Sequence, residues 1–287
     1  MTFNRIKEYL GTGIGTAGQL LLPRLILPML VQAVDKTLLD RSLAKWVMGP
    51  AQLSKQGGTF NVNLETPRTG KINEVAEGAE IPLTQQTYST ITFTFTKYGA
   101  AVRITREMME DSQFELLQSN IQMIGKRFAE NETKLVLEAL EGASTTVTGG
   151  AAITVANITT AMQNVEDEDF TPTDIIVGTE VLNDLRNIDT FSEANKWGGE
   201  AANRTGKIGL IYGLNVHLFS PNAAPATTFK RNAYVLDRSQ AYGIAIKRDI
   251  SVENTTLPTF DMEGAVVTQR LDVQLLRSTA VGRITTS

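Results

Sequence analysis

Few side chains in this sequence of 287 residues could catalyse a reaction or hold a metal ion. There is no cysteine, and His217 is the only histidine. Disulfides, thiolate metal sites, iron–sulfur clusters and cysteine nucleophiles are therefore excluded, and acid–base chemistry is left with one imidazole. His217 stands in an apolar strand pattern without a matched serine, and we interpret it as an ordinary strand residue. The shortage favours a structural role.

The densest group of carboxylates is the run Glu-Asp-Glu-Asp at 166–169. A calcium or magnesium site needs carboxylates that converge from several turns of the chain, whereas consecutive carboxylates point in different directions. A charge run of this kind is typical of a solvated helix end. We therefore predict no metal site and no catalytic residue.

Two glycine motifs suggest phosphate binding at first sight. The glycines within 13–18 match G-x-G-x-x-G, but this motif binds dinucleotides only between a buried strand and a helix. Here residues 5–10 have an amphipathic helical pattern, and Pro23 and Pro28 disfavour a following helix. Gly206-Lys207 lacks the earlier glycine and the following Ser or Thr of a phosphate loop. A dinucleotide-dependent enzyme would rest on the first motif alone, and we predict no cofactor.

Composition and charge limit the remaining classes. Lys plus Arg number 27 against 31 for Asp plus Glu, which gives a net charge of -4 and argues against a dedicated nucleic-acid reader. Hydrophobic residues make up 42% and charged residues 20%, as in globular proteins. At about 150 residues per domain, the length allows one large or two modest domains.

The N-terminal region and the segment at 57–98 have the patterns of extended segments rather than of compact domains. The most apolar stretch, 20–34, is interrupted by Pro23 and Pro28 and is shorter than the roughly 20 residues that cross a bilayer. We expect an extended arm and no membrane partner. Residues 57–98 contain two segments with period-two alternation around a polar, turn-rich middle, which predicts a two-stranded projection. Because isolated two-stranded ribbons are marginal in water, both limbs are expected to need a neighbouring surface.

A long helix is expected next. Ser112 and Glu115 form a capping box, and Gly142 supplies a stop, so the pattern predicts a helix over 113–141. Its apolar residues recur at helical spacing and favour a core-facing stripe. They are Leu117, Ile121, Ile124, Phe128 and Leu135.

Beyond residue 150 helical and strand patterns alternate, which predicts an α+β fold with a mixed sheet. Helices are expected at 157–166 and 180–187, and strands at 174–177, 214–219, 233–236, 242–246 and 266–276.

This order of elements resembles the major capsid proteins of tailed bacteriophages, which have the Hong Kong 97-type fold. The strongest similarity comes from Val-Ala-Glu-Gly-Ala-Glu-Ile-Pro at 75–82, Thr-Phe-Thr at 92–94 and the segment 104–112, which looks like an extended loop that returns into a spine helix. Further similarity lies in 209–220 and 266–284.

The resemblance implies a division of the chain. It comprises an N-terminal arm (1–56), an extended loop (57–98), a peripheral domain (99–149) with a spine helix at 113–141, an axial domain (150–250), peripheral strands (251–276) and a return to the axial domain (277–287).

The resemblance also implies a function. The chain would self-assemble into pentamers and hexamers of an icosahedral head around double-stranded DNA, in the virion, after assembly in the host cytoplasm. Some members link their subunits through a lysine, an asparagine and a glutamate. The matching positions here are Ile81, Asp261 and Thr268, which lack that chemistry, so we predict a shell without isopeptide crosslinks.

Expected partners are further copies of the chain, a portal and decoration proteins. Scaffolding would come either from a segment cut away from before the N-terminal arm or from a separate protein, and the sequence favours the separate protein. DNA contact would be non-specific, and the basic pairs Lys126-Arg127, Lys230-Arg231 and Lys247-Arg248 are either DNA contacts or solvated charges. An alternative with the same fold is an encapsulin-like compartment that encloses an enzyme. The long N-terminal arm favours the virus.

Overall fold

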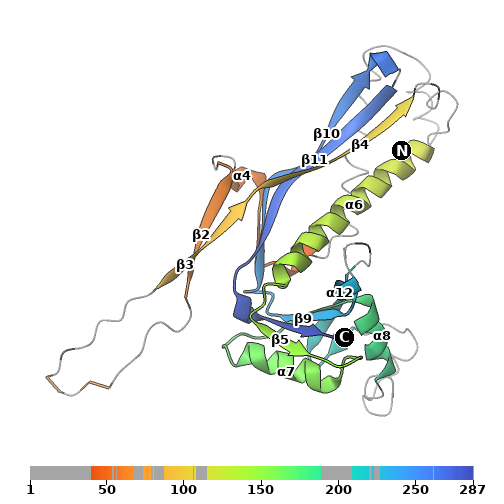
Figure 1. The fold of residues 1–287 in the computed structure, drawn as a ribbon. Helices are drawn as coiled ribbons and strands as arrows, with labels where there is room; N and C mark the ends of the chain where they lie inside the picture. The colour runs from red at the N-terminus through yellow and green to blue at the C-terminus, as the bar shows by residue number, and fades with distance from the viewer. Residues whose placement is uncertain are drawn as a thin grey trace.

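A computed structural model describes residues 40–53, 55, 57–66, 74–75, 77–78, 80, 87–105, 107, 115–188, 209–219, 222, 227–260 and 262–286. The most apolar N-terminal stretch, both glycine motifs and the capping-box serine lie outside the described residues. Figure 1 shows two sheets connected by one long helix, with a thin projection on one side.

The first sheet is long and four-stranded, in the order β1 (Trp46–Met48), β10 (Tyr242–Leu257), β11 (Met262–Leu275) and β4 (Thr96–Thr105). β1 lies parallel to β10, and the other neighbours are antiparallel. The helices α3 (Asp40–Leu43) and α4 (Pro50–Leu53) flank β1, and the 3-10 turn Pro258–Phe260 joins β10 to β11. β10 extends well beyond the strand predicted at 242–246, so the boundary drawn at residue 250 falls inside it.

Helix α6 (Glu115–Leu140) packs on one face of the four-stranded sheet, as Figure 1 shows. Ile124 and Phe128 are buried against Val267 of β11, which confirms this part of the predicted stripe. The side chains of Leu117 and Ile121 lie outside the described residues. The helix ends where the backbone N–H of Gly142 donates to the carbonyl of Ala139 at 3.0 Å.

The second sheet has six strands in the order β5-β12-β9-β6-β8-β7. β5–β12 and β6–β8 are parallel and the other pairs antiparallel, which confirms the predicted mixed sheet and the α+β class. The strands are β5 (Thr145–Thr148), β6 (Asp174–Val177), β7 (Leu210–Ile211), β8 (Leu214–Leu218), β9 (Asn232–Leu236) and β12 (Val281–Thr285).

Three helices accompany the six-stranded sheet: α7 (Val155–Glu166), α8 (Thr179–Asn187) and α12 (Thr227–Lys230). One face, with Ile175, Val177 and Val235, packs against α7 and α8. The other face, with Ile176 and Tyr234, shares a core with the end of α6 and the near ends of β10 and β11. The two sheets therefore meet through a continuous apolar core.

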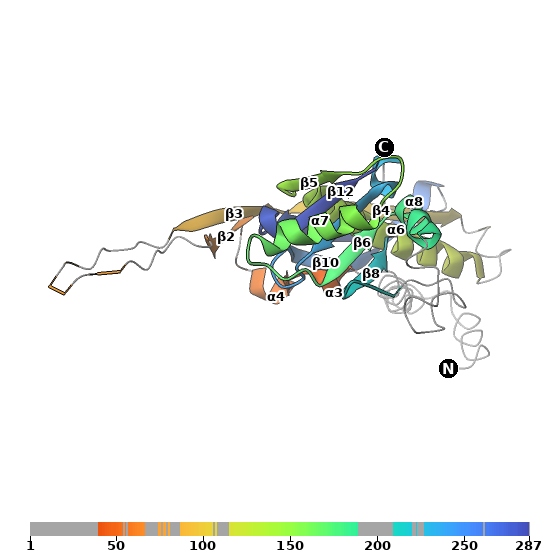
Figure 2. The ribbon, with the colours of Figure 1, turned by 90° about the horizontal axis from the view of Figure 1, so that it is seen from below.

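The hairpin of β2 (Thr59–Glu65) and β3 (Tyr88–Thr94) forms the projection. It extends away from both sheets in two perpendicular views (Figures 1 and 2). Its register pairs Phe60 with Phe93 and Val62 with Ile91, so the apolar residues share one face, as the alternation predicts.

Candidate assembly surfaces

The root of the projection is anchored on its own subunit. Phe93 is fully buried and lies beside Trp46, with ring centroids 5.7 Å apart, and Leu53 of α4 belongs to the same cluster. Arg277 donates to the carbonyl of Glu65 at 2.8 Å. For residues 40–53 and the root, the neighbouring surface that the sequence predicts therefore lies within the same subunit, because the aromatic face turns toward the four-stranded sheet.

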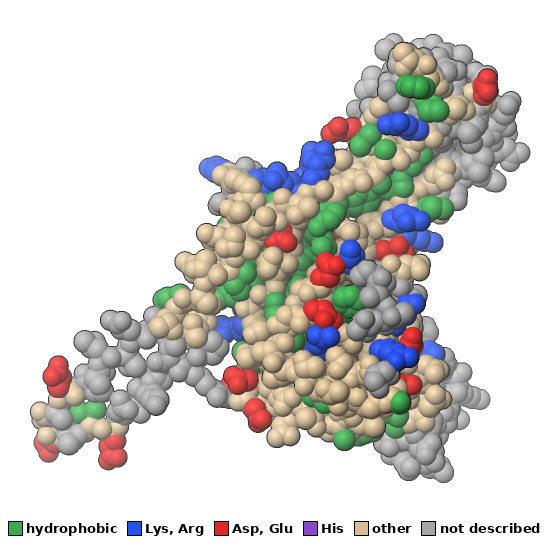
Figure 3. All heavy atoms as spheres, viewed as in Figure 1, with side chains coloured by type: hydrophobic (Ala, Val, Ile, Leu, Met, Phe, Trp, Pro, Cys, Tyr) green, Lys and Arg blue, Asp and Glu red, His purple; other side chains and the backbone are tan. Residues whose placement is uncertain are grey.

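The described tip of the projection is polar and exposed. Glu74, Val75, Glu77, Gly78 and Glu80 are all exposed, and Gly78 has φ +79°, a left-handed conformation that favours glycine in a turn. Figure 3 shows acidic side chains at the far end of the projection, well away from the sheets. The tip therefore presents negative charge at the end of the projection that lies away from the two sheets.

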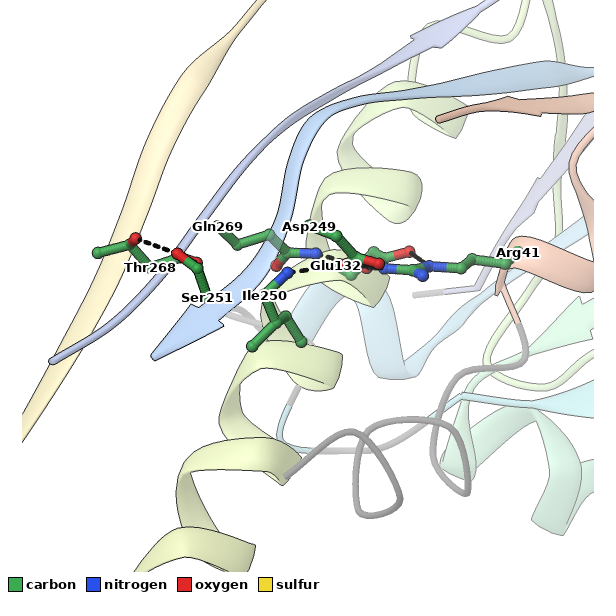
Figure 4. Close-up of polar contacts among 7 residues, drawn as sticks. All are labelled: Arg41, Glu132, Asp249, Ile250, Ser251, Thr268 and Gln269. Atoms are coloured by element: carbon green, nitrogen blue, oxygen red, sulfur yellow. Dashed lines mark hydrogen bonds and ion pairs between the residues drawn. The ribbon is translucent and has the colours of Figure 1, made fainter. Parts of the chain in front are cut away.

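An ion pair with a buried carboxylate connects the N-terminal segment to the long helix. Arg41 of α3 donates from Nε to Glu132 Oε1 at 2.7 Å and from Nη2 to Oε2 at 3.0 Å, and the carboxylate of Glu132 is only 1% exposed. Figure 4 shows that Gln269 of β11 and Asp249 of β10 complete the cluster. Gln269 donates to Glu132 at 3.4 Å, and Asp249 lies 3.6 Å from Arg41.

The surroundings keep the guanidinium of Arg41 charged. Burial alone would lower the pKa of Arg41, but the hydrogen bond and charge of Glu132, aided by Asp249, outweigh it and raise that pKa. The register of β10 against β11 shifts between Arg248 and Ser251, so the sheet is irregular beside this ion pair. The cluster thus fixes α3, α6 and the irregular part of the sheet to one another.

A second polar cluster lies where the two sheets meet. Glu141, just after α6, accepts hydrogen bonds from Tyr234 at 2.8 Å and Asn232 at 2.9 Å and pairs with Arg283 at 2.8 Å. Burial raises the pKa of Tyr234 far above its ordinary value, and its hydrogen bond to Glu141 acts in the same direction. The end of the long helix is thereby connected to β9 and β12.

His217 forms a contact that the sequence does not reveal. Its Nε2 lies 2.8 Å from Oδ1 of Asp174, whose side chain is 4% exposed, and Thr173 donates to the other carboxylate oxygen at 2.7 Å. His217 does lie in β8, as predicted, and the contact connects β8 to β6. The contact between His217 and Asp174 thus joins two strands. Among the described residues, no nucleophilic side chain forms a hydrogen bond with the imidazole of His217.

The acidic run at 166–169 is exposed at the end of α7. Within the described part of the chain, no group of three potential metal ligands converges.

Of the three positions compared with the crosslinking residues, Ile81 and Asp261 lie outside the described residues. Thr268 is 4% exposed and shares a hydrogen bond with Ser251 at 3.0 Å. None of the described helices combines the length and the apolar character of a membrane span.

Large exposed apolar side chains stand at the extremities of the molecule. Tyr88 of the projection is 65% exposed, and Phe260 at the far end of the β10–β11 hairpin is 67% exposed. Leu210 and Leu218, at 63% and 47%, lie at the β7–β8 edge of the six-stranded sheet. Each alone is ordinary for a protein surface.

The sequence matches a profile of the phage capsid family over residues 18–285. No curated protein sequence gives a match. A chain of Mycobacterium phage Che8 superposes with a TM-score of 0.66 at 15% identity, covering 81% of this chain and 86% of the other. The capsid of a native GTA particle gives 0.66 at 14% identity, covering 86% and 89%. A virus-like particle from Pyrococcus furiosus gives 0.61 at 10% identity, covering 90% and 96%.

The described residues form a long helix on an extended sheet, a second mixed sheet and a projecting hairpin. The chain belongs to the phage capsid family and has the Hong Kong 97-type fold that its sequence resembles. It is thus a capsid shell protein and a virion component, in a family that is structural. Sequence reasoning missed Arg41 and Glu132, because a contact across 91 residues leaves no local pattern.

Proposed function

We propose that this chain is the major capsid protein of a tailed-phage head, in which pentamers and hexamers form an icosahedral shell around double-stranded DNA. The family assignment supports the shell. The observation that carries the finer proposal is the projection, whose anchored root and exposed tip would place part of each subunit on a neighbour. Repetition of one such contact closes a shell of identical copies.

The proposed organisation keeps an N-terminal arm, an extended loop, a peripheral domain and an axial domain. The four-stranded sheet with α6 would form the peripheral domain, and the six-stranded sheet would form the axial domain around a capsomer axis. On this division the peripheral part begins again with β10 at Tyr242, and β5 at Thr145 and β12 belong to the axial part.

The enclosed DNA would touch the shell without being held tightly. The net charge of -4 supports this, because tight binding needs many cations that neutralise phosphates. Lys126 and Arg127 are exposed on α6. Arg231, just after α12, is also exposed, whereas Lys230 is half-buried. Arg231 is paired with Glu180 at 2.7 Å. Scaffolding, portal and decoration proteins are further proposed partners, with assembly in the host cytoplasm and no enzymatic activity.

The shell would be held without isopeptide crosslinks. Thr268 supports this, because its hydroxyl is buried against Ser251 and it carries no carboxylate. A denaturing gel of mature particles should show this protein as a single band at the mass of one subunit. A ladder of covalent multimers would contradict the proposal.

Electron microscopy of the purified protein tests the assembly itself. Closed hollow shells with five-fold and six-fold capsomers are expected, whereas a compact monomer at high concentration would overturn the proposal. The alternative, a compartment that encloses an enzyme, is consistent with the similarity to the Pyrococcus furiosus virus-like particle. Particles isolated from the native source decide between the two: nuclease-protected double-stranded DNA supports the head, and a co-purifying protein cargo supports the compartment.

A further inference from the structure

Two basic residues from distant parts of the sequence lie beside the start of β10. The backbone N–H of Lys45, between α3 and β1, donates to the carbonyl of Tyr242 at 2.9 Å. The backbone N–H of Arg277, two residues after β11, donates to the carbonyl of Ala241 at 3.3 Å. Because Ala241 and Tyr242 are consecutive, these hydrogen bonds bring both basic residues to one short stretch of chain. We call Lys45 and Arg277 the cation pair.

The guanidinium of Arg277 is held in place and keeps an unused donor. Its Nη2 donates to the carbonyl of Glu65, at the end of β2, at 2.8 Å. Its Cζ lies 5.9 Å from the ring centroid of Phe170, which is within the range of a cation–π contact. Its Nε is shielded from solvent and has no hydrogen-bond partner among the described residues. A buried donor of this kind is costly unless a water or an ion satisfies it.

The ammonium of Lys45 also has donors to spare. Its Nζ donates to Oε1 of Gln240, a neutral amide, at 2.8 Å. An ammonium group has three N–H donors, so two remain after this contact. Within the described part of the chain, no carboxylate forms an ion pair with Lys45 or Arg277. The positive charge of the cation pair is therefore not neutralised by direct contact with a described carboxylate.

The carboxylate in the turn between β9 and β10 is already engaged elsewhere. Asp237 accepts hydrogen bonds from the N–H and Oγ of Ser239 at 2.8 Å and 2.7 Å, and from the N–H of Thr171 at 3.3 Å. Burial lowers the pKa of Lys45, the charge of Arg277 lowers it further, and the charge of Asp237 only partly opposes them. The two cations thus repel each other across this site.

The donors of the cation pair suit a tetrahedral oxyanion. A guanidinium offers several N–H groups in a fixed plane, and an ammonium adds a compact point charge; both are common ligands of phosphate groups in proteins. A phosphate has enough oxygens to accept from Lys45 and Arg277 at the same time. It would satisfy free donors and relieve the repulsion between the two cations.

We infer that Lys45 and Arg277 form a binding site for a phosphate group, either free phosphate or a phosphodiester of nucleic acid. Arg277 also holds the root of the projection through the carbonyl of Glu65. A bound phosphate would therefore connect the projection root, the segment before β1 and the start of β10. The site lies within one subunit, so the inference does not depend on the formation of shells.

Titration of inorganic phosphate into the unassembled full-length protein tests the site. Calorimetry at constant ionic strength, with chloride as the balancing anion, should show saturable binding to one site. Lys45→Gln and Arg277→Gln should each weaken binding by about tenfold or more, because each removes charge-assisted hydrogen bonds. Lys45→Arg, which keeps the charge, should retain most of the affinity.

A matched control separates the site from net charge. Lys126→Gln combined with Arg127→Gln removes two exposed cations from α6 and should leave the affinity for phosphate unchanged. Circular dichroism verifies the folding of every variant. Arg277→Gln also loses the contact with Glu65, so Lys45→Gln, which leaves that contact in place, is the decisive variant.

A short double-stranded oligonucleotide identifies the source of the phosphate group. Binding of inorganic phosphate that Lys45→Gln weakens supports a site for the free anion. Binding of the oligonucleotide alone, weakened by the same substitution, supports a site for a phosphodiester. The inference is overturned if neither ligand binds, if Lys45→Gln binds as tightly as the original, or if the α6 control loses as much affinity.

Discussion

The two sheets of this subunit differ in how completely they are covered. Every residue of β6 and β9 in the six-stranded sheet is buried. In the four-stranded sheet, β4 exposes Lys97, Gly99, Ala101 and Arg103 on the face away from α6. A sheet covered on both faces is complete within one chain, whereas a sheet covered on one face keeps a surface for other molecules. The two central strands β6 and β9 are thus complete within one subunit, whereas β4 keeps an exposed face.

The largest effect is expected from breaking the ion pair between Arg41 of α3 and the buried Glu132 of α6, on the side of the open sheet. Arg41→Ala would leave the carboxylate of Glu132, which is 1% exposed, without its cation. Removing one partner of such a pair destabilises by about 3–5 kcal/mol. Urea unfolding of the unassembled subunit measures this loss.

A double variant provides the control for this ion pair. Arg41→Met combined with Glu132→Leu should cost less than Arg41→Ala alone, because no unpaired charge then remains. Equal losses in the two variants would show that packing, rather than charge, accounts for the effect.

Matched core truncations sharpen the comparison between the sheets. Val235→Ala, in the fully buried β9, should cost about 2–3 kcal/mol from lost burial and a cavity that cannot collapse. Val267→Ala, under α6 in the open sheet, should cost about 1–2 kcal/mol, because its half-buried neighbours Ala265 and Ile250 can adjust. Thermal unfolding of both variants gives the ranking, and the reverse order would contradict the contrast.

The contribution of Tyr234, at the junction between the sheets, to the unfolding free energy should depend on pH in the alkaline range. Burial raises the pKa of Tyr234, so its contribution is fully present below the unfolded pKa of about 10 and is lost as the pH rises above it. Tyr234→Phe should cost about 1 kcal/mol near neutral pH, through the lost hydrogen bond to Glu141. It should also flatten the fall in unfolding free energy above pH 10. An unchanged alkaline slope would rule out Tyr234 as its source.

The smallest effect is expected on the solvent side of the helix. Lys134 and Glu138 lie 3.5 Å apart, one turn from each other, and both are more than a third exposed. Lys134→Ala should change the free energy of unfolding by about 0.5 kcal/mol or less. A loss above 1 kcal/mol would show that this surface is engaged in a contact within the unassembled subunit.

Local patterns predicted the elements whose causes are local. The strand at Asp174–Val177 and the helices ending at Glu166 and Asn187 follow directly from apolar runs and helical spacing. β10 was underestimated because Lys247, Arg248 and Asp249 interrupt the apolar pattern at a register shift. These polar residues stay in the strand because β11 pairs with β10 on either side of them. Local periodicity does not show which strand lies alongside.

The assembly surfaces were less accessible to sequence reasoning than the fold. The alternation at Phe60, Val62 and Leu64 predicted a ribbon, but not that its root would pack against Trp46 and Leu53. Lys97 and Arg270 are separated by a long segment of sequence, and only strand register brings them together. Long-range pairing, rather than composition, determines these surfaces.

The position of β12 has a consequence for biosynthesis. This strand lies between β5 and β9, and β5 has no other strand partner among the described residues. The sheet that begins at Thr145 can therefore close only after the ribosome has released the segment up to Thr285. Nascent chains that stop earlier would leave the flank of β9 as an unpaired strand edge, which is open to aggregation.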